Sequence, residues 1–195
     1  MRAITLILLL MPILSYSQVG NKKDILGAGV QDSVLGTSIV LKDNSLIYQK
    51  VFSSDKSRPD LLMELKNFLT TTKGFKLENE TDKQISGQLI DYVVNYKMFG
   101  GSSLGSGALL KYPIAAKVII QVKDSAYRIS IFDMAFKGLV NPITFAKSDL
   151  ELSEAVTTNK RSKISNKELA INTLTILDKD LTSSFDLNIK RISEF

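Results

Sequence analysis

The segment from Ala115 to Phe136 sets the fold class of this chain. Apolar and polar side chains alternate along Ala115–Lys123 and again along Ala126–Phe136, which is the period-2 pattern of half-buried strands. Asp124 and Ser125, between the two runs, are enough for a tight turn. The sequence therefore predicts a β-hairpin, and with it an antiparallel sheet.

Three further segments extend the predicted sheet. Ser45–Phe52 alternates as a strand, a short strand begins at Phe75, and a long strand runs from Gln84 to about Tyr96. The apolar parity of the long strand changes near Leu89. That change indicates either a bulge there or a stretch buried on both faces.

Two helices accompany these five strands. Ser57 can cap the first helix, Pro59 suits its first turn and Gly74 suits its end. Ser165 and Glu168 have the spacing of a capping box for the second helix. Apolar residues then recur at helical spacing in each: Leu61, Leu62, Leu65, Phe68 and Leu69 in the first, and Ala170, Leu174, Leu177, Leu181 and Phe185 in the second. The order strand, helix, four strands, helix predicts an α+β fold in which a five-stranded antiparallel sheet carries both helices on one face.

The order of these elements resembles a known family. The run Leu46–Val51, the helix Leu61–Thr71, the hairpin Phe75–Asn95, the strand Tyr127–Ile131 and the capped C-terminal helix are similar to a domain of unknown function with a TATA-binding-protein-like (TBP-like) fold. That family occurs in exported bacterial envelope proteins, usually right after a signal peptide. The resemblance covers roughly residues 44–185. It implies a fold, and it supplies no activity and no catalytic residue.

The N-terminus has the layout of a secretory signal peptide over residues 1–17. Arg2 precedes an apolar run from Ala3 to Leu14, and the small residue Ser17 follows. The run is only about a dozen residues long and contains Pro12, whereas a helix needs ~20 residues to span a bilayer. We therefore predict cleavage after Ser17, no transmembrane span in the rest of the chain, and an exported protein that is periplasmic or extracellular.

The chain contains no cysteine and no histidine. It therefore has no disulfide, no thiolate nucleophile and no lipid attached to an N-terminal cysteine, so it is not a lipoprotein. A Ser-His-Asp triad and a histidine-containing zinc site are excluded as well. We predict no cofactor and no bound metal, and a domain that is stabilised by its hydrophobic core alone.

The sequence after residue 17 divides in two. Residues 18–43 are rich in glycine and predict a loosely structured leader with at most one short strand, at Thr37–Leu41. Residues 44–195 form the predicted domain, and a long polar connection occupies residues 138–164.

The net charge of +5 is small, and the densest basic runs of the chain have no neighbouring aromatic side chain on which a base could stack. Nucleic acid is therefore not an expected partner.

The face of the predicted sheet opposite the helices is the candidate site. It can be an ordinary hydrated face, since an antiparallel sheet often leaves one side to water. Alternatively, Val93, Ile119 and Phe132 form an apolar centre inside a charged rim, which would bind an envelope protein or a small ligand. The predicted face consists of Asp91, Val93, Asn95, Lys117, Ile119, Gln121, Arg128, Ser130 and Phe132.

We predict a non-enzymatic exported module that binds a partner through this face. The alternative is a hydrolase that works with carboxylates and without histidine, for instance with Asp91 and Asp133. A purely structural accessory domain is the third interpretation. The Gly-Ser loop at residues 100–107 leads into a strand and lacks a phosphate-binding pattern, so we interpret it as a flexible connection.

Overall fold

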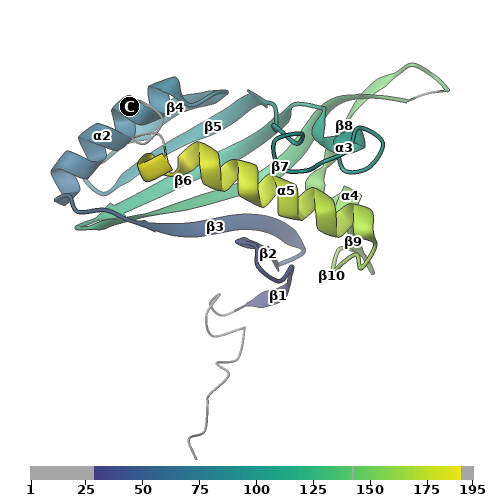
Figure 1. Cartoon of the computed structure of the whole chain (residues 1–195), viewed down its shortest axis with the longest axis horizontal. Helices are drawn as coiled ribbons and strands as arrows, with labels where there is room; N and C mark the ends of the chain where they lie inside the picture. Colours follow the sequence, from purple (N-terminus) through teal and green to yellow (C-terminus); the bar gives the residue numbers. More distant parts are fainter. Residues whose placement is uncertain (1–28, 142, 190–195) are drawn as a thin grey trace, which may run out of the picture.

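The computed structural model describes residues 29–141 and 143–189, and an antiparallel sheet lies at its centre (Figure 1). The signal peptide predicted at residues 1–17 and the first part of the predicted leader lie outside the described residues. The large sheet has eight strands in the order β1-β2-β3-β7-β6-β5-β4, and β8 pairs with the outer half of β7. Its strands are β1 (Val30–Ser33), β2 (Ile39–Lys42), β3 (Ser45–Ser53), β4 (Phe75–Glu80), β5 (Gln84–Tyr92), β6 (Ile114–Lys123), β7 (Ala126–Val140) and β8 (Lys147–Glu151).

The α+β class is confirmed, and the predicted number of strands was wrong. The short strand expected within the leader at Thr37–Leu41 corresponds to β2, and Val30–Ser33 forms a further strand, β1; both belong to the sheet. The predicted polar connection at 138–164 contains the end of β7, β8, the short helix α4 (Leu152–Val156), and a small separate hairpin of β9 (Thr157–Thr158) with β10 (Lys163–Ile164). β1, β8, β9 and β10 are short or exposed, so they carry no burial pattern that a sequence could display.

Two long helices, α2 (Arg58–Thr71) and α5 (Glu168–Phe185), pack on the same face of the sheet (Figure 1). The strand register explains why this face is apolar. Ile129 pairs with Ile120, and Ile120 pairs with Ile85, so a row of buried isoleucines crosses three strands beneath the helices. A shorter helix, α3 (Gly107–Leu110), lies beside α5. None of the helices in the described part of the chain is long and apolar enough to cross a membrane.

The helix termini differ from the predicted caps. Ser57 is the N-cap residue of α2, but its hydroxyl donates to the Asp60 carboxylate at 2.6 Å instead of bonding to the helix backbone. The capping box at Ser165 does not form, because α5 begins at Glu168 with Lys167 as its N-cap residue. Both predictions placed the start of the helix within a few residues, but neither of the predicted side-chain capping hydrogen bonds forms.

The C-terminal end of α5 is held by Tyr127 of β7. Its hydroxyl donates to the carbonyl of Phe185 at 2.9 Å and accepts from the N–H of Leu187 at 3.0 Å. The Tyr127 ring stacks on Phe52 of β3 with a centroid distance of 5.0 Å. One buried tyrosine thus ties the last turn of the helix to the centre of the sheet.

Candidate binding face

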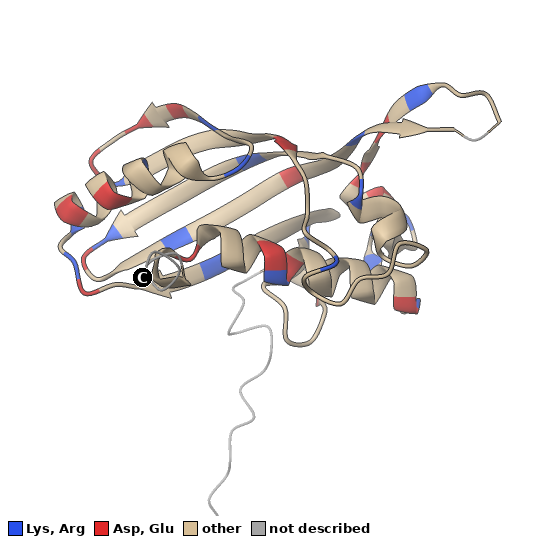
Figure 2. Cartoon of the chain, turned by 45° about the horizontal axis from the view of Figure 1, so that its top comes forward, with Lys and Arg blue, Asp and Glu red and all other residues tan. Residues whose placement is uncertain are grey.

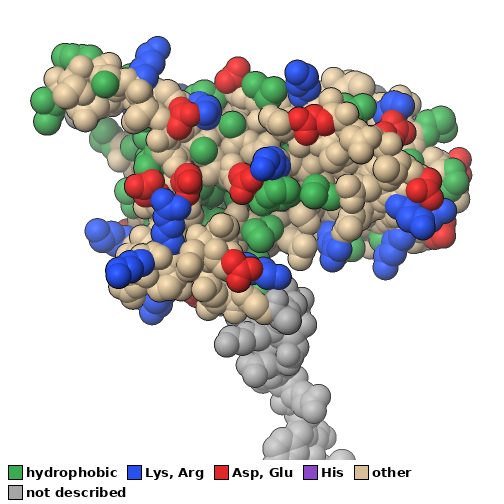
Figure 3. Space-filling model, turned by 180° about the vertical axis from the view of Figure 1, so that it is seen from behind, with side chains coloured by type: hydrophobic (Ala, Val, Ile, Leu, Met, Phe, Trp, Pro, Cys, Tyr) green, Lys and Arg blue, Asp and Glu red, His purple; other side chains and the backbone are tan. Residues whose placement is uncertain are grey.

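The sheet face opposite α2 and α5 carries six of the predicted site residues: Lys117, Ile119, Gln121, Arg128, Ser130 and Phe132. Strand alternation puts them there, because their neighbours Val118, Ile120, Ile129 and Ile131 point into the core. In β6 and β7, Lys117 pairs with Phe132, Ile119 with Ser130, and Gln121 with Arg128. No helix in the described part of the chain covers this surface, which faces the viewer in Figure 3. We refer to it as the open face.

Val93 and Asn95 do not lie on the open face, so this part of the prediction was wrong. β5 ends at Tyr92, and the chain then runs on the helix side of the sheet. There the N–H of Asn95 donates to the Asp180 carboxylate of α5 at 3.1 Å, and Val93 lines a cavity together with Asp180. Asp91 lies at the strand's irregularity between Leu89 and Tyr92, with a positive φ of 54°. The bulge predicted near Leu89 is therefore present, and it redirects the chain away from the open face.

The apolar centre of the open face forms with a different third member. Ile119 and Phe132 are half-buried there, and half-buried Ile47 of β3 takes the place that we predicted for Val93. Ile47 precedes Tyr48, which pairs with Ile131, so the antiparallel register sets it beside Phe132. Figure 3 shows apolar side chains near the middle of this face next to acidic and basic ones.

Hydrogen bonds between neighbouring strands fix the polar side chains of this surface. Arg128 donates through Nε to Gln121 Oε1 at 3.0 Å and also through Nη2 to the same oxygen. Lys117 forms an ion pair of 2.9 Å with Asp133, and the hydrogen bond and charge of that carboxylate raise the pKa of the Lys117 ammonium. Side chains that are already ordered lose less conformational entropy when a partner binds.

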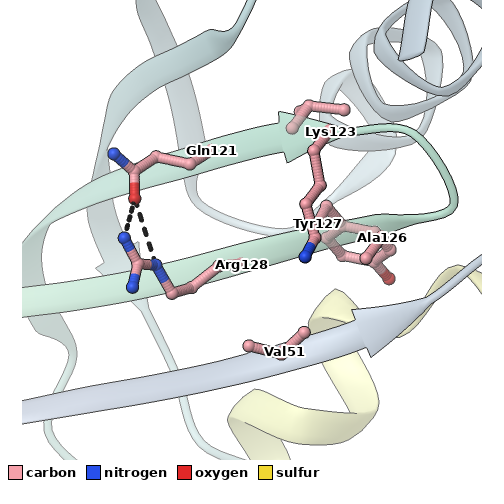
Figure 4. A pocket seen from close by; sticks show the side chains of 7 residues that line it. Val51, Gln121, Lys123, Ala126, Tyr127 and Arg128 are labelled. Atoms are coloured by element: carbon pink, nitrogen blue, oxygen red, sulfur yellow. Dashed lines mark hydrogen bonds between the residues drawn. The ribbon is translucent and has the colours of Figure 1, made fainter. Parts of the chain in front are cut away.

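A hollow of about 300 Å³ opens at one end of this face, where β3, β6 and β7 meet. Val51 and Ala126 supply an apolar floor, and the cations Lys123 and Arg128 stand at its rim. In Figure 4 the Lys123 side chain extends from β6 toward β7, and the Arg128 guanidinium lies farther along the same strands. Two cations beside an apolar floor can hold an anionic group such as a carboxylate.

A buried carboxylate, Asp180, lies on the helix side of the sheet. Tyr92 donates its hydroxyl to Oδ2 of Asp180 at 2.5 Å, while the N–H of Asn95 donates to Oδ1. The side chain is only 6% exposed. Burial raises the pKa of Asp180 above its ordinary range, although these hydrogen bonds oppose the shift.

A second buried carboxylate, Asp178, points to the other side of α5. It accepts from the N–H of Ser38 at 2.6 Å, and burial raises its pKa too. Together the two aspartates fasten α5 to the end of β5 and to the segment that precedes β2. The sequence analysis missed both, although one signal was present: Asp178 follows Leu174 by four residues and precedes Leu181 by three, so it stands in the apolar stripe.

Asp91 and Asp133, the pair considered for a hydrolase, flank β6 on either side. Each lies at an irregularity of its strand with φ of 54°. A strand spacing of ~4.8 Å places their backbones about 10 Å apart. Asp133 is occupied by the ion pair with Lys117, and its side chain is 55% exposed. The carboxylate that would act on a substrate is therefore already engaged by a lysine of the same face.

The comparisons with known proteins give similarities of structure alone. No family model matches the chain, and no curated protein sequence matches it. One similar solved structure is a TBP-like protein from Parabacteroides distasonis, with 12% identity, a TM-score of 0.47, and coverage of 78% of this chain and 90% of that one. Another is a DUF4468 family protein from Bacteroides ovatus, with 15% identity, a TM-score of 0.47, and coverage of 78% and 92%. Both descriptions are of the kind that the sequence resemblance names, and neither states an activity, a ligand or a partner.

Proposed function

We propose that the protein is a non-enzymatic binding module whose open face holds a partner that presents an anionic group beside apolar surface. The hollow between Lys123 and Arg128 carries the proposal, because it puts two cations beside apolar Val51 and Ala126 at one end of a face whose centre is also apolar. Ile119 and Phe132 of that centre lie on the same two strands as the cations. A single partner can therefore contact both the charged and the apolar parts.

The charges of the open face favour an acidic partner. Asp133, one of its acids, is already paired with Lys117, and Glu78, which bonds to the neutral amide of Gln88 at 2.5 Å, does not line the hollow. Arg128 bonds to a neutral amide, so its positive charge is not compensated by that contact. Charge complementarity of this kind increases association rates and disfavours partners of the wrong sign.

Capture from the organism's own envelope extract, read by quantitative mass spectrometry, tests the proposal. The bait is the chain from Gln18, the residue that follows the predicted cleavage position. Ile119→Glu places a charge in the apolar centre, and Arg128→Glu reverses the charge at the hollow. We expect both variants to lose the partner that the unmodified protein captures, while their melting temperatures stay close to its own.

Two matched variants control for the changes in charge. Leu104→Glu introduces the same carboxylate at an apolar residue that is 97% exposed in the Gly-Ser loop, and Lys97→Glu reverses an exposed charge on the helix side of the sheet. Both should capture the partner as before. Unchanged capture by Ile119→Glu, or a large loss of its stability, contradicts the proposal, as does the absence of any reproducible partner.

The alternative function is a hydrolase that uses Asp91 and Asp133. The observation in its favour is that both aspartates occupy strand irregularities on opposite sides of β6. Replacing Asp133 with Asn should abolish any hydrolytic activity of the purified protein on glycoside substrates if this function is correct. For the binding module we expect no such activity before or after the substitution.

We further propose that the protein is exported to the periplasm or beyond. The signal-peptide pattern of residues 1–17 supports this, and that segment lies outside the described residues. Cell fractionation combined with N-terminal sequencing tests it. The mature chain should begin at Gln18, and a cytoplasmic protein that retains Met1 would contradict the proposal.

A further inference from the structure

The hairpin of β7 and β8 reaches beyond the rest of the molecule (Figures 1 and 2). Its outer end carries two large apolar side chains in water, Ile143 with 85% and Phe145 with 78% of the residue exposed. Val140, further down the same hairpin, is exposed as well. Exposed apolar groups on a projecting element indicate a contact that the isolated chain does not make.

The backbone of this outer end is hydrogen-bonded within itself. Asn141 accepts through its side-chain oxygen from the N–H groups of Ile143 and Thr144, and through its carbonyl from the N–H of Phe145. The N–H of Asn141 donates to the carbonyl of Ala146, and that of Ala146 to the Thr144 hydroxyl. These donors therefore need no water. A loop that enters an apolar medium must meet this condition, because an unsatisfied donor there costs several kcal/mol.

The hairpin carries one exposed cation between its apolar outer end and the ion pair at its base. This arrangement suits a lipid surface, which has anionic headgroups outside an apolar interior. An ion pair between Lys137 and Asp149 closes its base, and Asp149 also accepts from the N–H of Gly138 at 3.1 Å. Between these two residues, Lys147 is the only charged side chain. It is exposed on β8, so its ammonium can lie among headgroups while the apolar end goes deeper.

The small size of the apolar end favours a lipid surface over a protein as its partner. A stable protein interface buries ~800 Å² on each side, which two side chains at the end of a narrow hairpin do not provide. Insertion into the headgroup region needs only a few apolar groups and an attraction to anionic lipid. We infer that the outer end of the β7–β8 hairpin docks on an anionic lipid surface, with Phe145 and Ile143 inserted and Lys147 at the headgroups. This inference is independent of the function proposed for the open face.

The backbone of Phe145 supports a role for its side chain. Its φ is 55°, in the left-handed region where glycine or asparagine is favoured and a bulky side chain is strained. A turn that served only to connect two strands would be more stable with glycine at this position. Phe145→Gly therefore separates the two roles: it should keep or raise the melting temperature and weaken the attachment to lipid.

Tryptophan fluorescence provides a reporter at this site, since the chain has no tryptophan of its own. The test uses the chain from Gln18, which lacks the apolar run at Ala3–Leu14, with Phe145→Trp and vesicles of phosphatidylglycerol with phosphatidylcholine. We expect the emission to shift to shorter wavelengths and to be quenched by brominated acyl chains. Lys147→Gln in this background should weaken the partition about fivefold.

Two controls complete the experiment. Leu104→Trp places the same reporter at an equally exposed apolar position away from the hairpin, and its emission should not change. In an Ile143→Trp reporter, adding Phe145→Gly should weaken binding about tenfold or more. The inference is overturned if the emission of Phe145→Trp does not respond to these vesicles, if Leu104→Trp responds equally, or if Phe145→Trp responds only to envelope protein from which the lipid has been removed.

Discussion

The hydroxyl of Tyr92 at the end of β5 donates a 2.5 Å hydrogen bond to the carboxylate of Asp180 on α5, and both side chains are buried. The two residues are 88 positions apart in the chain. Asp180 also receives the N–H of Asn95, so one carboxylate fixes both the helix and the segment that leaves the strand. After the bulge has redirected the chain, this contact holds Asn95 on the helix side of the sheet.

Replacing Tyr92 with Phe removes the hydrogen bond to the Asp180 carboxylate and a second one to the Ser184 hydroxyl at 2.8 Å. We expect the free energy of unfolding to fall by about 2 kcal/mol, measured by urea denaturation. Tyr48→Phe is the matched variant, because the Tyr48 hydroxyl bonds to the neutral hydroxyl of Thr182 at 3.1 Å. It should cost only about 1 kcal/mol. Equal losses in the two variants would contradict the importance of the Asp180 charge.

The raised pKa of Asp180 predicts a definite pH dependence. The folded protein keeps the proton to a higher pH than the unfolded chain, whose carboxyl titrates near the ordinary value of 3.8. The stability that this group contributes is therefore complete below pH 3.8 and is lost as the pH rises through the folded pKa. Relative to Asp180→Asn, the unmodified protein should gain stability when the pH falls from 7 toward 4.

Asp149 provides a control for the sign of this effect. Hydrogen bonds from Lys137 and from the Gly138 N–H hold its pKa below the ordinary value, so its contribution is present above pH 3.8 and is lost as the pH falls through the lowered pKa. Relative to Asp149→Asn, the unmodified protein should lose stability on acidification below pH 4. Parallel curves for the unmodified protein and Asp180→Asn would show that the Asp180 pKa is not raised.

Thr173 on α5 offers a stabilising substitution. It is fully buried, and its hydroxyl has no hydrogen-bond partner among the described residues. Thr173→Val replaces that hydroxyl with a methyl group of similar size and should raise the free energy of unfolding by about 1 kcal/mol. The same change at Thr182, whose hydroxyl bonds to Tyr48 and Lys50, should lower it. Calorimetry of the two variants gives shifts of opposite sign if this reasoning is right.

Gly87 in β5 leaves no room for a side chain. A Cβ atom there would lie 2.4 Å from the carbonyl oxygen of Lys76 and 2.6 Å from the Phe75 ring. Gly87→Ala should destabilise the fold by about 2 kcal/mol, because backbone must move. Gly36 has a positive φ of 80° but open space around it, so Gly36→Ala should cost only about 1 kcal/mol. Thermal melts that rank the two variants the other way would contradict the close packing of β4 on β5.

The elements with a strong local period could be predicted from the sequence. The alternation of β6 and β7 and the apolar stripes of α2 and α5 identified these elements within a few residues, because side chains two, three or four positions apart share a face whatever the rest of the chain does. The same alternation placed Lys117, Ile119, Gln121, Arg128 and Phe132 on one surface.

Only the tertiary structure decided the rest. β1 and β8 are strands because β2 and β7 supply their hydrogen bonds, and Ile47 reaches the apolar centre only through the pairing of β3 with β7. Asp180 is buried because Tyr92 and Asn95, which are 88 and 85 residues away in the sequence, donate hydrogen bonds to its carboxylate. Such contacts depend on which elements meet in space, and a local pattern carries no information about a partner that lies elsewhere in the chain.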